Sequence, residues 1–132
     1  MKIRKAQKKD LNKLIKLEKE SHKEITWWSP LNLSEFQKLI RKRLVYVAED
    51  KKEIIAYLNG NVKDNQLFLE DIYVKKEFRN NGIGKKLIKF FLADWKKSKF
   101  KEVRLDCPER LRKFYEKFGF KTTALIMKKK LK

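Results

Sequence analysis

The sequence contains little of what interrupts, cross-links or anchors a chain. Among 132 residues it has two prolines, four glycines and one cysteine, Cys107. A lone cysteine cannot form an internal disulfide, which is typical of a reducing compartment, and we expect a cytoplasmic protein. We expect Cys107 itself to be a small buried hydrophobe. No apolar run approaches the roughly 20 residues that cross a bilayer, and the chain does not open like a signal peptide, so we expect no membrane partner.

Acidic residues are also scarce, with 17 against 36 basic residues and a net charge of +19. Two interpretations are open: a phosphate-rich partner such as RNA or the ribosome, or a lysine-rich composition without a dedicated partner. The lysines are spread along the whole chain, whereas nucleic-acid readers gather arginine and aromatic residues on one face, which favours the second. The few cysteines and histidines do not have metal-ligand spacing, so we expect no metal.

The length fits a single domain, residues 1–132. Apolar periodicity predicts alternating strands and helices, with Asp10 as a helix cap and Gly119 as a helix end. The resulting order is β-α-α-β-β-β-α-β-α-β, a mixed α/β layered structure. The expected strands cover residues 2–6, 45–49, 54–62, 67–74, 102–107 and 120–127, and the expected helices begin near residues 10, 34, 84 and 108.

The segment that follows the strand 67–74 is the strongest candidate for a ligand site. It ends in Arg79-Asn80-Asn81-Gly82-Ile83-Gly84, directly before a helix. Glycines permit close approach of the backbone to a ligand, and the helix start adds free N–H groups and a positive dipole end. Arg79 and Lys85 add charge, so the segment suits a pyrophosphate. It lacks the Gly-Lys-Ser/Thr ending of a P-loop, and the plainer alternative is an ordinary glycine-containing helix start.

Combined with a late segment, RKFYEKFGF at residues 112–120, this loop resembles the GNAT-type N-acetyltransferases. The family patterns Arg/Gln-x-x-Gly-x-Gly/Ala and Tyr-x-x-x-Gly-Phe match here, and the opening of the chain is similar to the family's first strand and helix. The resemblance covers nearly the whole chain. Two positions depart from it: Pro108 replaces a frequent asparagine, and Asn80 replaces a frequent glycine. The matching residues are Arg79, Gly82, Gly84, Tyr115, Gly119 and Phe120.

The resemblance implies a single N-acetyltransferase domain with a mostly antiparallel, twisted sheet of six to seven strands and about four helices. It implies transfer of the acetyl group of acetyl-CoA to a primary amine within a ternary complex. The acceptor stays open between a small molecule, a polyamine and a protein amine, and a homodimer is possible. The alternative from another class is a non-enzymatic RNA- or ribosome-binding module on a degenerate acyltransferase fold.

The resemblance also implies roles for individual residues. The amides of the loop would hold the cofactor pyrophosphate, and the end of the preceding strand would hold the pantetheine arm at a bulge, with an N–H near Val74 polarising the thioester carbonyl. Tyr115 would protonate the leaving thiolate, although it could equally be a core aromatic between Phe114 and Phe118. The implied cofactor-binding residues are Ile72, Tyr73, Val74, Arg79, Asn80, Asn81, Gly82, Ile83, Gly84, Lys85 and Tyr115.

An amine attacks only when unprotonated, and its pKa lies near ~10, so a general base is needed. Glu70 and Asp71 are the candidates, and their adjacent positions on a strand point to opposite faces. The acidic pair is also similar to the polyamine branch of the family, where it helps hold a cationic acceptor. We favour Glu70 as base and acceptor contact, with a structural pairing to lysine as the alternative. Trp27 and Trp28 either line the acceptor pocket or pack between the two N-terminal helices.

Overall fold

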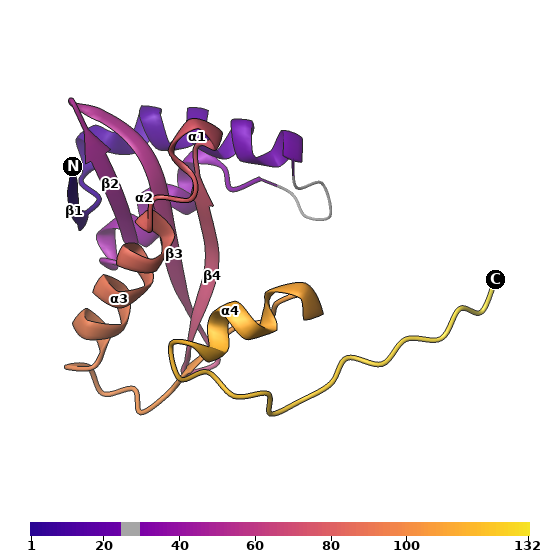
Figure 1. The fold of residues 1–132 in the computed structure, drawn as a ribbon. Helices are drawn as coiled ribbons and strands as arrows, with labels where there is room; N and C mark the ends of the chain where they lie inside the picture. Colours follow the sequence, from indigo (N-terminus) through magenta and orange to yellow (C-terminus); the bar gives the residue numbers. More distant parts are fainter. Residues whose placement is uncertain (25–29) are drawn as a thin grey trace.

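The computed structural model describes residues 1–24 and 30–132, and in these ranges helices cover both faces of a five-stranded sheet (Figure 1). The strands follow one another in sequence order, antiparallel through the fourth, and the fifth runs parallel to the fourth. The expected mixed, mostly antiparallel α/β architecture is therefore confirmed. The strands are β1 Lys2–Lys5, β2 Val45–Asp50, β3 Glu53–Lys63, β4 Gln66–Val74 and β5 Val103–Arg104, and the helices are α1 Leu11–Glu24, α2 Leu33–Arg41, α3 Ile83–Trp95 and α4 Arg112–Glu116.

Alternation along the strands divides the core between two faces of the sheet. On one face, Phe36 of α2 meets Tyr57 of β3 edge to face, with ring centroids 5.9 Å apart. On the other, Phe91 of α3 meets Tyr46 of β2 in the same way at 5.7 Å. Because neighbouring strand residues point in opposite directions, a residue's place along β3 or β4 decides whether it faces α1 and α2 or faces α3.

The starts of the two N-terminal helices differ slightly from expectation. The α2 helix begins at Leu33 with a capping box, in which the Asn32 Oδ1 accepts from the Glu35 N–H at 2.9 Å. Asp10 does not cap α1. It ends a short 3-10 turn, is 2% exposed, and accepts two hydrogen bonds from the Arg4 guanidinium at 2.7 and 2.9 Å. A buried carboxylate needs such a partner, so this aspartate ties β1 to the start of α1.

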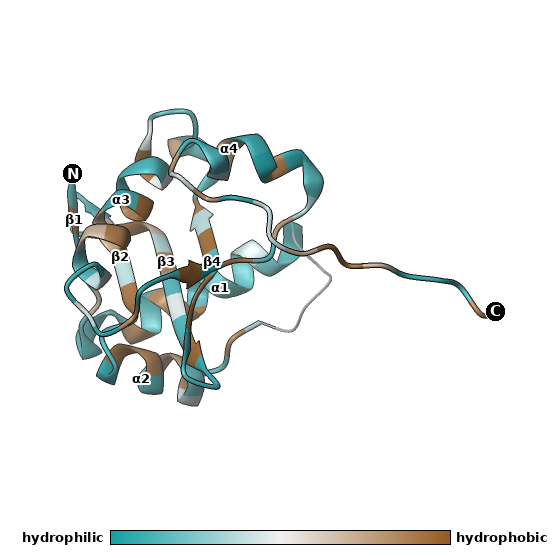
Figure 2. Cartoon of the chain, turned by 90° about the horizontal axis from the view of Figure 1, so that it is seen from below, coloured by the Kyte–Doolittle hydropathy of each residue, from teal (hydrophilic) through white to brown (hydrophobic). Residues whose placement is uncertain are grey.

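The C-terminal part differs most from the sequence expectation. The predicted strand 120–127 does not form, and residues 121–132 extend away from the sheet with exposed side chains (Figure 1). The described residues therefore contain five strands rather than six or seven. The strand expected over 102–107 has only two paired residues, Val103 and Arg104. An edge with two paired residues offers few backbone groups to a further strand of eight residues. The apolar stretch of the tail lies outside the body (Figure 2).

Two further predictions are wrong for the segment between β5 and the C-terminal tail. The helix expected from Pro108 to residue 118 becomes a 3-10 turn at Glu109–Leu111 followed by the short α4, and Gly119, at φ +90°, ends it as predicted. Cys107 is exposed rather than buried, because the strand ends before it. None of the helices described is long and apolar enough to span a membrane.

Candidate active site at the end of β4

A bulge interrupts β4 at its acidic pair. Asn59 of β3 pairs with Asp71 and Gly60 pairs with Leu69, which leaves Glu70 without a partner. One extra residue on a strand bends it and redirects the neighbouring side chains, and bulges occur often beside active sites. The bulge that the sequence resemblance implies in this strand is therefore confirmed, and its extra residue is Glu70, one of the two candidate bases.

The two carboxylates lie in different surroundings. The Glu70 carboxylate lies 3.5 Å from the Lys63 ammonium, at the surface. Asp71 is half-buried, and burial raises its pKa from 3.8 to about 7, with the charges of Glu18 and Glu70 adding to the effect and Lys63 opposing it. A carboxylate that titrates near neutral pH is well suited to proton abstraction.

Glu18 of α1 lies near Asp71, on the face of the sheet that α1 covers. Its side chain is 1% exposed, and the Tyr57 hydroxyl donates to its Oε2 at 2.6 Å. Burial raises the pKa of Glu18, although the bond from Tyr57 works in the other direction. Glu18, Tyr57 and Asp71 thus form an acidic cluster between α1 and the bulge.

Beyond the bulge, the backbone of β4 is open on the side of β5. The pairing of β4 with β5 involves only Leu67 and Phe68, so the strands diverge from Leu69 onwards. On the other side, the Lys75 N–H bonds to the Ile55 carbonyl of β3 at 2.9 Å. Because alternate residues of an antiparallel strand direct their N–H groups to opposite sides, the N–H groups of Ile72 and Val74 point to the open edge.

The glycine-containing loop next to this edge presents a run of free amides. Asn80 and Gly82 have φ of +65° and +75°, and Gly82 is the N-cap of α3. The Lys86 N–H is the first in this region that bonds within the helix, and it donates to the Gly82 carbonyl at 3.0 Å. A Cβ built on Gly82 would meet no atom within 4 Å, so the space in front of the helix start is open within the described structure. The loop therefore has the free donors and open approach that an anion needs.

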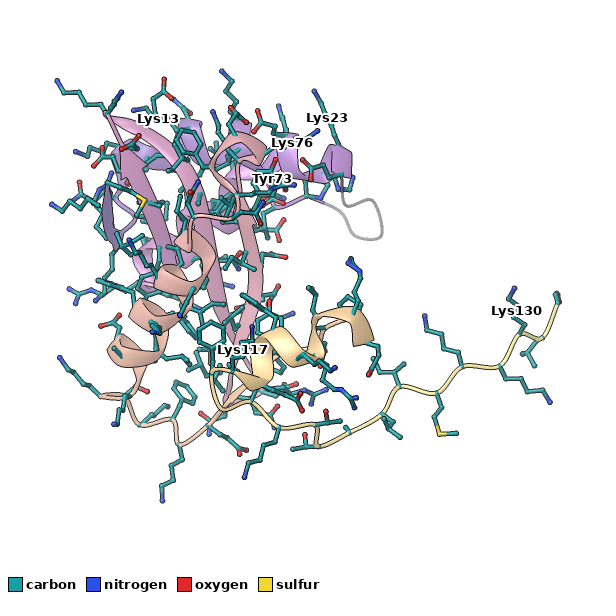
Figure 3. All side chains as sticks on the ribbon, viewed as in Figure 1. Lys13, Lys23, Tyr73, Lys76, Lys117 and Lys130 are labelled. Atoms are coloured by element: carbon teal, nitrogen blue, oxygen red, sulfur yellow. The ribbon has the colours of Figure 1, made fainter. Side chains whose placement is uncertain are left out.

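Arg79 has partners of its own. Its guanidinium donates to the Glu24 carboxylate of α1 at 2.8 and 3.1 Å and, through Nε, to the Val74 carbonyl at 2.9 Å. It also lies over the ring of Tyr73, the residue labelled in Figure 3, at 5.4 Å from the ring centroid. The Tyr73 hydroxyl donates to the Glu24 carboxylate at 3.3 Å. Arg79 consequently fixes the end of β4 and the start of the loop against α1.

Tyr115 of α4 lies close enough to Asp71 for the charge of that carboxylate to act on it. It is 7% exposed, and burial raises its pKa to about 12, with Cys107 and Asp71 adding to the effect. The hydroxyl consequently keeps its proton at neutral pH.

Next to α4, a hollow of about 260 Å³ is lined by Lys85, Lys89, Phe114, Lys117 and Phe118. Three ammonium groups with two aromatic rings are suited to a phosphate-bearing aromatic ligand.

A family model described as an acetyltransferase (GNAT) domain matches residues 41–122, a range that includes β2 through α4 and the whole glycine-containing loop. The chain belongs to the GNAT family of acetyltransferases. A curated GNAT relative, glucosamine 6-phosphate N-acetyltransferase of Arabidopsis thaliana, is 34% identical over 61 residues. That alignment spans 46% of this chain and 41% of the relative.

Solved GNAT structures share the fold. A predicted acetyltransferase with acetyl-CoA from Clostridium acetobutylicum has a TM-score of 0.75 at 20% identity, covering 98% of this chain and 96% of that one. Ard1 from Thermoplasma volcanium has a TM-score of 0.75 at 24% identity, covering 93% and 84%. The Arabidopsis glucosamine-6-phosphate enzyme has a TM-score of 0.68 at 23% identity, covering 99% and 98%.

The structure adds residues that sequence reasoning missed in this GNAT domain. Glu18 and Glu24 both lie on α1, and neither was expected near the site. For Glu18 a signal existed, because it shares the buried face of α1 with Leu11, Leu14 and Ser21 at helical spacing. A carboxylate on a buried helix face needs a partner. Trp27 and Trp28 lie outside the described residues. No group of three His, Cys, Asp or Glu residues in the described ranges could hold a metal ion.

Proposed function

We propose that this protein transfers the acetyl group of acetyl-CoA to a primary amine by direct attack in a ternary complex, with Asp71 as the general base. The observation that carries the proposal is the position of Asp71: half-buried at the bulge, with a pKa of about 7, beside the open edge of β4. Glu70 is the second candidate for the base, and the exchange of each carboxylate for its amide separates the two.

Acetyl-CoA, when bound, supplies an acyl group activated as a thioester. The residues present fit such a molecule. The free amides from Asn80 to Lys85 suit the pyrophosphate, the N–H groups of Ile72 and Val74 suit the pantetheine arm, and the hollow between α3 and α4 suits the phosphorylated adenosine. Arg79 supports this site by fixing the start of the loop against Val74 and Glu24.

The chain's own groups have matching proton-transfer roles. Asp71 takes one proton from the ammonium form of the acceptor, whose nitrogen then forms the new bond to the acyl carbon as the carbon–sulfur bond breaks. The excess proton that this nitrogen then carries passes to solvent. The N–H of Val74 stabilises the charge on the acyl oxygen, and the Tyr115 hydroxyl gives its proton to the leaving sulfur. Without a base, an alkylamine with a pKa near ~10 is almost wholly protonated at neutral pH.

The test is a thiol-release assay with acetyl-CoA and a panel of primary amines, preceded by a thermal shift with acetyl-CoA, free CoA and RNA. We expect stabilisation by both CoA forms and turnover with at least one amine. Stabilisation by RNA and none by either CoA form would instead support the non-enzymatic RNA-binding alternative.

Asp71→Asn should lower turnover by roughly 10² to 10⁴, whereas Glu70→Gln should have a smaller effect. The reverse ranking would assign the base to Glu70.

A further inference from the structure

Glu18 is a buried carboxylate with an incomplete set of partners. Its Oε2 accepts from Tyr57, and the backbone of Leu31 lies close enough to favour its charged form, but its Oε1 has no hydrogen bond of good geometry among the described residues. A buried carboxylate oxygen without a donor keeps the full cost of leaving water, so this arrangement destabilises the folded protein when no ligand is bound. A donor brought by a ligand would remove that cost.

A second unpaired oxygen lies on the same face of the sheet. Asn59 is fully buried, and its Nδ2 donates to the Gly60 carbonyl at 3.3 Å, while its Oδ1 has no partner in the described structure. Asn59 is two residues from Tyr57 on β3, so both side chains point toward α1. It is also the direct cross-strand partner of Asp71. Three acceptor side chains, two of them fully buried, therefore belong to one region next to the bulge.

We propose that Glu18, Asn59 and Asp71 form the subsite that receives the amine of the acceptor as an ammonium group, and that this subsite selects small cationic amines without an anionic group near the amine. This inference rests on the proposed acetyl transfer. An ammonium has three N–H donors and no acceptor, which matches three oxygens from three side chains. The charges of Glu18 and Asp71 act on each other, so both carboxylates would repel a phosphate or carboxylate on the substrate, and the same residues exclude anionic amines.

Glu18 acts here as a positioning residue. Its charge attracts the ammonium and keeps Asp71 basic enough to accept one proton, which leaves the nitrogen lone pair free to attack the acyl carbon. The other charged and titratable groups facing the pair come from every neighbouring element. They are Tyr57 and Lys63 on β3, Glu70 on β4, His22 on α1, Glu35 on α2 and Tyr115 on α4.

The experiment compares Glu18→Gln with the wild-type protein and with Glu20→Gln, a matched control on the exposed face of α1. In Glu18→Gln we expect the KM for the amine to rise about tenfold or more, the KM for acetyl-CoA to stay unchanged, and the acid limb of the kcat profile to move to lower pH. The control should match the wild type. A purely structural role for Glu18 would not move the pH profile.

A second measurement needs no variant and uses ethanolamine and phosphoethanolamine, which differ by one phosphate. We expect kcat/KM to be about tenfold or more higher for ethanolamine. Equal use of both amines, or an unchanged pH profile in Glu18→Gln, would overturn the subsite. A wild-type protein that binds acetyl-CoA but acetylates no amine would instead overturn the proposed function itself, so the two failures are distinguishable.

Discussion

Replacing Asp71 with asparagine should separate stability from catalysis. The pKa of Asp71 is about 7 in the folded protein and 3.8 in the unfolded chain. Between these values the folded form holds a proton that the unfolded form has lost, so the free energy of unfolding falls as the pH rises from 4 to 7. A difference of about three in pKa corresponds to about 4 kcal/mol, and partial solvent screening reduces the expected effect to about 2 to 4 kcal/mol.

Asparagine has nearly the same shape and no charge, so the variant avoids this loss. We expect Asp71→Asn to match the wild type near pH 4 and to be about 2 to 4 kcal/mol more stable at pH 8, while turnover falls. Urea unfolding at several pH values measures this difference, with the exposed turn variant Asp64→Asn as control. A stability difference that stays constant from pH 4 to 8 would refute the assigned pKa and the reasoning that makes Asp71 the base.

Three further changes test other parts of the site. Gly82→Glu should abolish acetyl-CoA binding in calorimetry, because Gly82 has φ +75° and faces open space where a carboxylate would repel phosphate. Retained affinity would refute the assignment of the loop to the pyrophosphate. Tyr115→Phe should lower kcat and spare acetyl-CoA affinity, and unchanged turnover would remove its role as acid. Gly60→Ala should lower stability by about 1–3 kcal/mol in urea unfolding, since a Cβ would lie 2.8 Å from Phe91 Cε2 and 2.9 Å from the Phe68 carbonyl; a neutral effect would show that α3 can shift.

Local patterns identified the strands and helices correctly wherever one element has one clear buried face. The stripe of α3 and the alternation of β2 to β4 are such cases, and helix-stop chemistry identified Gly119. The C-terminal strand failed because apolar, β-prone residues such as Leu125 and Ile126 predict a strand only if an edge is available. The structure shows that β5 is too short to provide that edge within the molecule.

By itself, the sequence determined the loop from Arg79 to Gly84, the acidic pair and Tyr115, because these depend on residue types at short, fixed spacing. Only the tertiary structure decided which member of the acidic pair is exposed and which is half-buried. The bulge leaves Glu70 at the surface beside Lys63 and places Asp71 near the buried Glu18, 53 positions earlier in the chain. The physical reason is that a pKa depends on burial and on neighbouring charges in space, and packing α1 over the sheet sets both.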